Sequence, residues 1–420
     1  MIDVRQWLHR LCLLAAVILL QACASSGVLQ TARDQFRQGN TDAALQTLSS
    51  ADVAKRNRLL LYLDRGLIAQ AAGNYSDSIN ALSQAADLVE KLDFVSFSEQ
   101  TTSLIANDWT TSYRGEYSER LWIHTFQMMN YLLINKPEGA AVEARRALKV
   151  FENHGTSLKA DNVTRMLMAM SFEAAGQYDS AAVEYRKLFK DAADVPGIAA
   201  AALRNAKALG RADDAARYAA AVSSDHTGNA SNDSELIVLL ANGFIEAKLP
   251  GNLFIAADMR VSFPYYPSTW QTVPTIDATV DGQTTSTTTT PLPLLNISQT
   301  ALNARGKKIA AKQALRIAAK YNIGESVGDE YGEVTGSLVR TLLFLLEQAD
   351  TRSWETLPAQ LSLVRIPMTA GTHTVVLNIR DSTGIHSTQI EDIRTFSGRR
   401  SFRLLRTGID TIRNDSSLTH

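Results

Sequence analysis

The side chains best suited to proton transfer or metal binding lie close together between positions 108 and 124. They are Asp108, Glu116, Glu119 and His124. Carboxylates beside an imidazole can exchange protons or coordinate a divalent cation. No second histidine lies at metal-ligand spacing from His124, which argues against a metal site. We favour the alternative, in which buried, hydrogen-bonded side chains pin an inserted segment to the helices around it.

Motifs typical of other catalytic mechanisms are missing from the sequence. It contains no HExxH pair, no phosphate-binding glycine loop, no dinucleotide fingerprint and no Ser/His/Asp order. We therefore expect no enzyme, no cofactor and no metal. A net charge of −1 over 420 residues also argues against nucleic acid as a partner, because no overall positive field attracts phosphates.

An apolar run near the N-terminus indicates export. Residues 1–10 carry a weak positive charge, from Arg5 and Arg10 against Asp3, and residues 11–20 are all apolar. At about ten residues, this run is too short to span a bilayer and is typical of a signal peptide. No later segment has the length and apolar character of a membrane helix.

The sequence Leu20-Gln21-Ala22-Cys23 resembles the lipobox of bacterial lipoproteins. That resemblance implies removal of residues 1–22, acylation of Cys23 as the first mature residue, and, with Ala24 next, sorting to the outer membrane. Acyl chains buried at about 0.8 kcal/mol per CH₂ group would anchor the protein permanently, facing the periplasm. Cys12 leaves with the signal, so the mature chain would have no free thiol for a disulfide, a zinc site or a nucleophile.

A repeated pattern extends from about residue 28 to residue 222. Gly66-x-x-Ala69-x-x-x-Gly73-Asn74-Tyr75 recurs as Ala169-x-x-Phe172-x-x-x-Gly176-Gln177-Tyr178, and weaker copies align on Gly39, Asn135 and Gly210. Gly39 and Gly73 are 34 positions apart, as are Gly176 and Gly210. The pattern resembles the tetratricopeptide repeat (TPR), a helix–turn–helix of 34 residues, and the alternative is a generic helical bundle. A generic bundle would leave the period unexplained.

The residue types in the repeat fit its geometry. Glycines at positions 39, 73, 176 and 210 suit a turn between two helices, where a Cβ atom is disfavoured. Tyr75 and Tyr178 would open the second helix of a pair and wedge between its two helices. Small residues let the paired helices approach closely: Ser78, Ala140, Ala181 and Ala215. Stacked pairs would form a solenoid with a concave face.

The second half has shorter, β-branched runs. We expect residues 23–222 to form the repeat domain, with an insertion near 94–119. A linker over residues 223–234 should follow, then an α/β domain over 235–412 and a polar tail over 413–420. The fold class is thus α+β multidomain, an all-α TPR-like solenoid followed by strands with two inserted helices. Strands are predicted at 236–240, 254–263, 360–366, 374–379, 389–396 and 401–405, and 360–366 and 374–379 should pair as a hairpin. We expect the Thr-rich run 284–290 to be either mobile or at the edge of a sheet.

The two helices are predicted at 298–321 and 333–349. The first carries Lys308, Lys312, Arg316 and Lys320 at i+4 spacing, a basic stripe that is either a solvated face or a contact with anionic lipid or peptidoglycan. The second is strongly apolar, and we expect it to pack beneath the sheet. The aromatic cluster at residues 263–270 either stacks on a sugar or forms a proline-fixed turn, and we favour the turn.

Two longer segments extend the resemblance over nearly the whole mature chain. YRGEYSERLWIHTFQMMNYLL and ADTRSWETLPAQLSLVRIPMTAGTHTVVL look like an uncharacterised family of TPR-containing outer-membrane lipoproteins of Gram-negative bacteria. The resemblance implies a periplasmic or outer-membrane protein as partner, with an association with peptidoglycan synthesis. We expect a lipid-anchored scaffold whose TPR groove holds that partner. The alternative is an envelope regulator whose C-terminal domain binds peptidoglycan or lipid directly.

Overall fold

The computed structural model describes residues 27–95, 111–222, 234–256, 259–268, 273–345, 348–381 and 384–409. Cys23, Trp109 and Trp270 lie outside these ranges, as do most of the predicted linker and the polar tail. In the described ranges, no helix has the length and apolar character needed to cross a membrane.

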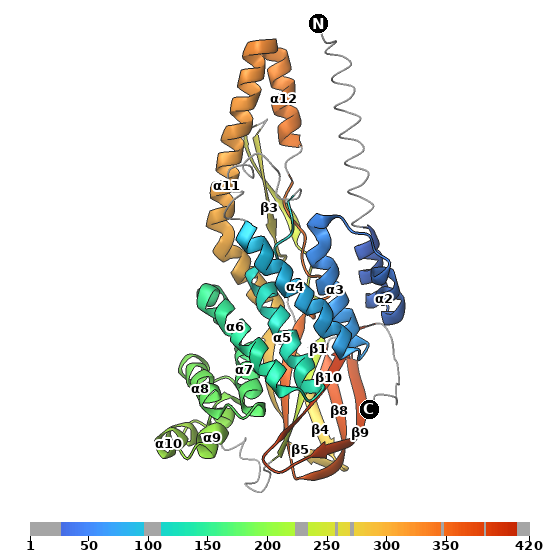
Figure 1. Cartoon of the computed structure of the whole chain (residues 1–420), viewed down its shortest axis with the longest axis vertical. Helices are drawn as coiled ribbons and strands as arrows, with labels where there is room; N and C mark the ends of the chain where they lie inside the picture. The colour runs from blue at the N-terminus through green and yellow to red at the C-terminus, as the bar shows by residue number, and fades with distance from the viewer. Residues whose placement is uncertain are drawn as a thin grey trace.

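Helices fill the first half of the chain and run along one side of the strands (Figure 1). They form antiparallel pairs, consecutive in sequence, that pack on one another in order. The helices are residues 27–37, α2 (Thr41–Ser49), the 3₁₀ turn η1 (Lys55–Asn57), α3 (Arg58–Ala71), α4 (Tyr75–Val95), α5 (Tyr117–Leu133), α6 (Pro137–Leu158), α7 (Asn162–Ala174), α8 (Tyr178–Ala192), α9 (Ile198–Ala208) and α10 (Ala212–Ala219).

The turn inside each pair has the same geometry five times in the described residues. Gly39, Gly73, Asn135, Gly176 and Gly210 all have a positive φ, between 54° and 80°. At the first turn, the N–H of Gly39 donates to the carbonyl of Phe36 at 2.9 Å, and the next N–H reaches back five residues at 2.9 Å. The other four turns repeat both bonds. This is the Schellman ending of an α-helix, which favours glycine and tolerates asparagine.

Small side chains lie where the paired helices approach each other. Ala140 and Ala181 are fully buried, and the Ser78 hydroxyl donates to the Gly66 carbonyl at 2.6 Å across the pair. The wedge expected of Tyr178 is not formed, because its residue is 41% exposed. Tyr75 is half-buried, and Ala215 is only partly buried at the end of the array. The size of a tyrosine ring at the start of the second helix was therefore not enough to predict that it packs between the two helices.

The strands form three sheets, two of them four-stranded. Sheet A has the order β10-β1-β7-β6, sheet C has the order β5-β4-β8-β9, and β2 pairs with β3. In sheet A, β1 is parallel to β10 and antiparallel to β7. The strands are β1 (Ser234–Asn242), β2 (Leu249–Ala256), β3 (Met259–Tyr265), β4 (Thr275–Val280), β5 (Gln283–Thr285), β6 (Thr288–Pro293), β7 (Gln360–Met368), β8 (Gly371–Asp381), β9 (Gly384–Thr395) and β10 (Arg400–Thr407).

Sheet A is covered on both faces. Alternate residues of β1, Leu236, Val238 and Leu240, pack against sheet C, while Ile237 and Leu239 join the core of the helices. Side chains alternate between the two faces of a strand, so a strand covered on both sides reads as a continuous apolar run. The molecule therefore has three layers: helices, sheet A and sheet C.

The inner face of the helical array, formed by the first helix of each pair, is covered by sheet A. Helix α5 packs on β10, and α7 packs on β6 and β7. At the first pair, Phe36 lies edge-on to Phe244, 5.4 Å between ring centroids. One hydrophobic core joins the helices to the sheet. This corrects the expected open TPR groove: most of the apolar face that would receive a partner is buried against the chain's own strands.

The hairpin predicted between residues 360–366 and 374–379 is wrong. β7 pairs with β1 and β6 in sheet A, whereas β8 pairs with β4 and β9 in sheet C. The short connection thus crosses between two stacked sheets. Strands β5 and β6 in the Thr-rich region are edge strands of sheets C and A, as its composition predicts.

The two helices between β6 and β7 form an antiparallel pair that extends away from the body, with β3 beside it (Figure 1). Helix α11 (Leu294–Tyr331) has 38 residues, about 57 Å at 1.5 Å per residue. Helix α12 (Glu333–Leu345) was expected beneath the sheet, but Val334 and Leu338 are 77% and 66% exposed. The helix packs along α11 instead of beneath the sheet.

Candidate functional site

The predicted acid–base cluster is divided among separate contacts. His124 Nδ1 lies 2.7 Å from Glu143 Oε2 and contacts neither Glu116 nor Glu119. Asp108 lies outside the described residues. Within the described ranges, no group of three histidine, cysteine or acidic side chains is placed to hold a metal ion.

Glu116 and Glu119, at the start of α5, hold the helical array to the second half of the chain. Glu116 forms ion pairs with Lys248, at 2.9 Å, and with Arg305 of α11. Burial opposes the charge on Glu116, but the two cations outweigh it and lower its pKa to about 2. Burial raises the pKa of Glu119, which accepts hydrogen bonds from the Tyr113 hydroxyl and the main-chain N–H of Trp354. Both carboxylates are at most 4% exposed.

The two long segments that carry the family resemblance meet in the core. Trp354 is fully buried and packs edge-on against Phe126, 5.8 Å between centroids. Beside it, Arg33 binds Asp64 and Glu355, both at 2.8 Å. Residues 350–357, which precede β7, therefore attach this strand to the helical array.

One cleft of about 1020 Å³ remains where the helical array and sheet A separate. The helices α5, α7 and α9 line one side. Residues of β1, β6 and β7 line the other side, together with residues 396–403, which include the start of β10. It is the part of the inner face that the sheet leaves uncovered. Its volume is that of a ligand-binding cavity.

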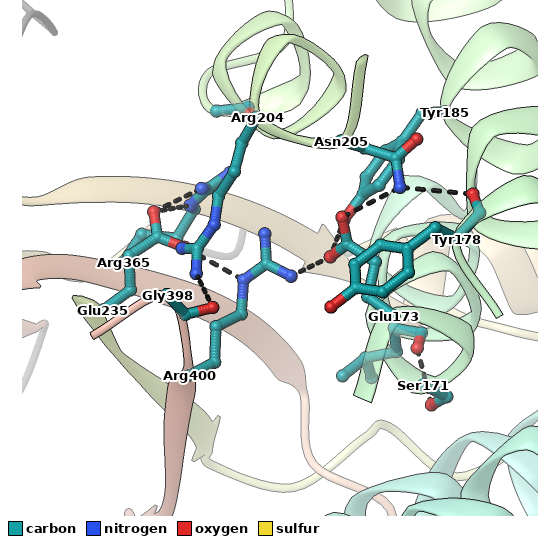
Figure 2. A network of polar contacts seen from close by, with 12 residues as sticks. Ser171, Glu173, Tyr178, Tyr185, Arg204, Asn205, Glu235, Arg365, Gly398 and Arg400 are labelled. Carbon is teal, nitrogen blue, oxygen red and sulfur yellow. Dashed lines mark hydrogen bonds and ion pairs between the residues drawn. The ribbon is translucent and has the colours of Figure 1, made fainter. Parts of the chain in front are cut away.

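A polar network crosses the base of this cleft (Figure 2). Arg400 of β10 lies between two carboxylates: its Nε is 2.9 Å from Glu235 Oε2, and its Nη1 pairs with Glu173 of α7. Glu235 also binds Arg204 of α9, at 2.6 Å, and Arg365 of β7. Glu173 accepts further hydrogen bonds from the Tyr185 hydroxyl and the Asn205 amide.

Charge is retained throughout this network. Burial opposes ionisation of Glu235, but Arg365 and Arg204 outweigh it and keep the pKa of that carboxyl below its ordinary value. Burial lowers the pKa of Arg400 to about 10, so its guanidinium is protonated at neutral pH. One nitrogen of that guanidinium, Nη2, is buried without a hydrogen-bond partner among the residues described.

The rim of the cleft holds side chains that the sequence did not single out for binding. Arg399 and Lys207 are exposed, Arg403 is half-buried, and Phe396 is 60% exposed. Tyr178, predicted as a packing residue, also lines this cleft. The one sequence feature that could have indicated these residues is the arginine-rich run at 399–406, part of which was predicted as a strand without a binding role. The basic stripe on α11 lies outside the residues whose side chains are described.

Comparisons with known proteins give structural matches only. No family model matches the sequence, and no curated protein is significantly similar to it. Among solved structures, MamA is 13% identical and superposes with a TM-score of 0.34 over 47% of this chain and 88% of its own. A second match is BtubC (BKLC) from P. vanneervenii, which is 13% identical and has a TM-score of 0.28 over 48% of this chain and 70% of its own.

A third match is PilW, described as a widely conserved type IV pilus biogenesis factor. It is 16% identical, with a TM-score of 0.24 over 47% of this chain and 91% of its own. All three TM-scores are below 0.5, so the description of the helical half as TPR-like rests on its five turns and paired helices.

Proposed function

We propose that this chain is a lipid-anchored scaffold of the cell envelope that binds a partner protein in the cleft between α9 and β10. The observation that carries this proposal is the cleft itself, the uncovered part of the inner face of the helical array. Exposed Tyr178 and Phe396 at its rim are the side-chain type enriched at the centres of protein interfaces. The lipobox-like sequence at Cys23 supports the anchor and the outer-membrane, periplasm-facing location.

The proposed role is not enzymatic. The buried carboxylates Glu116, Glu119, Glu173 and Glu235 all have partners that join the helical array to the second half of the chain. A group engaged in this way is not positioned against a substrate.

Affinity capture tests the proposal. The full chain, purified in detergent and immobilised, is incubated with envelope extract of the producing bacterium, beside a Tyr178→Ala/Phe396→Ala variant. We expect one protein to be retained in near-stoichiometric amount by the natural chain and lost with the variant. A captured set that is identical for both proteins would contradict binding in the cleft.

A second candidate, direct contact with a lipid surface, is favoured by the projecting pair α11–α12 and the β2–β3 hairpin. Their exposed apolar side chains include Leu253, Phe254, Leu315, Val334 and Leu338, each at least 58% exposed. Under the scaffold proposal, protein with Cys23→Ser does not bind anionic vesicles. Binding that is lost in high salt, and in a variant with glutamine at positions 308, 312, 316 and 320, would favour this second candidate.

A further inference from the structure

The cleft is strongly basic although the chain as a whole has a net charge of −1. Six arginine and lysine side chains line it against two carboxylates, Glu173 and Glu235. Both carboxylates are already paired with arginines at the base of the cleft. An excess of positive charge therefore remains on the walls.

Three of the cations have no carboxylate partner within the described parts of the chain: Lys207, Arg399 and Arg403. No ion pair joins the side chains of Lys207 or Arg399 to another residue there, and Arg403 donates only to the carbonyl of Phe402, at 2.9 Å. Arg400 adds its unpartnered Nη2 at the base. Unpaired guanidinium groups in a partly enclosed site favour carboxylate ligands, which accept two parallel hydrogen bonds from each.

The cleft also borders the edge of a sheet. Strand β10 is the terminal strand of sheet A. Ser401, Phe402 and Arg403 all line the cleft, although neighbouring side chains of a strand point to opposite faces. Three consecutive lining residues therefore bring main-chain atoms of this terminal strand to the wall of the cleft. Such an edge binds an extended peptide by main-chain hydrogen bonds.

We propose that the cleft binds an extended, acidic segment of the partner protein, laid along the edge of β10. In this arrangement, Lys207, Arg399 and Arg403 bind its carboxylates, and Tyr178 and Phe396 contact its side chains. This inference rests on the proposed function and adds the chemistry of the segment that is recognised.

Fluorescence anisotropy with defined peptides tests the inference. The full chain in detergent is titrated into labelled octa-glutamate, with octa-glutamine and octa-lysine as comparisons, at low and high salt. We expect binding of octa-glutamate alone, weakened by salt. The variant Lys207→Gln/Arg399→Gln/Arg403→Gln should bind at least tenfold more weakly.

A matched control separates the cleft from overall charge. Lys55, Lys91 and Lys149 are exposed and lie outside the cleft, so the variant Lys55→Gln/Lys91→Gln/Lys149→Gln removes the same charge elsewhere. We expect its affinity to stay within twofold of the natural chain. The double variant Lys207→Gln/Arg399→Gln, which changes exposed residues only, guards against unfolding and should also lose affinity.

The remaining outcomes are decisive. An equal loss in the control variant, equal binding of octa-lysine, or no binding of octa-glutamate would overturn the inference. Binding of purified sacculi without octa-glutamate binding would assign the cleft to peptidoglycan and also overturn it. If the cleft still retains a partner protein while octa-glutamate fails to bind, the scaffold proposal stands and only the acidic segment is wrong.

Discussion

Arg400 of strand β10 and Glu173 of helix α7 form a buried ion pair although 227 positions separate them in the chain. The pair joins the last strand of sheet A to the inner face of the helical array. Both residues line the cleft, one from each wall, so the position of the walls depends on this pair, which is drawn in Figure 2.

This pair should couple the two halves energetically. We expect Glu173→Gln and Arg400→Met each to destabilise the protein, by up to about 3–5 kcal/mol, the typical cost of removing one partner of a buried pair. In a double-mutant cycle, measured by urea unfolding, their coupling should be at least about 1 kcal/mol. The exposed pair Arg211 and Asp179, 2.7 Å apart, is the control and should couple by less than about 1 kcal/mol. Equal coupling for both pairs would contradict the buried link.

The repeat alignment makes a prediction at two neighbouring residues of α8. Ala181 is fully buried between paired helices, whereas Ser180 is exposed. Ala181→Trp should therefore destabilise by at least about 1–3 kcal/mol through overpacking. Ser180→Trp should be far milder, and thermal unfolding of both variants measures the difference. Equal melting temperatures would show that the helices do not meet at this position.

The lowered pKa of Glu116 should make the stability of the protein depend on pH. Its pKa is lowered in the folded state from 4.5 to about 2, so its stabilisation is fully present above pH 4.5 and is lost as the pH falls through 2. A shift of that size corresponds to about 3 kcal/mol. Urea unfolding at pH 6 and pH 2.5 should show a larger loss for the natural chain than for Glu116→Gln. The same loss in both proteins would mean that Glu116 is not the ionised partner of Lys248 and Arg305.

The anchor is tested at one residue. Cys23→Ala should abolish acyl labelling and processing at this site, because the thiol is the acyl acceptor that the lipobox resemblance implies. Metabolic labelling with a fatty acid and membrane fractionation provide the measurement. An acyl-labelled, processed Cys23→Ala protein in the outer membrane would refute the anchor.

The features predicted best from sequence are those set by local chemistry. Glycine at a positive φ marks four of the five turns inside the helix pairs because most other residues are strained there, and the period of 34 residues follows from stacking equal pairs. The run at residues 236–240 identified a strand buried on both faces. Asn135 takes the place of glycine at the remaining turn, since asparagine is the common substitute for glycine at a positive φ.

What covers an apolar surface could not be predicted in the same way. The inner face of the array is apolar whether a partner or the chain's own sheet packs on it, so the pattern alone suggested an open groove. For the same reason, β7 and β8 read as a hairpin, although they belong to different sheets. Tyr178 opens α8 as predicted, yet its ring lines the cleft, because the direction of a terminal side chain depends on distant strands.

Site-specific photo-crosslinking in intact cells tests the central claim, that a partner protein binds in the cleft between α9 and β10, most directly. A photoreactive amino acid is placed at Lys207 in the cleft and, as control, at Lys149, an exposed residue of α6 outside it. We predict one discrete protein adduct at position 207, absent at position 149 and reduced when Tyr178→Ala/Phe396→Ala is added. No adduct at position 207, or the same adducts at both positions, would contradict the claim.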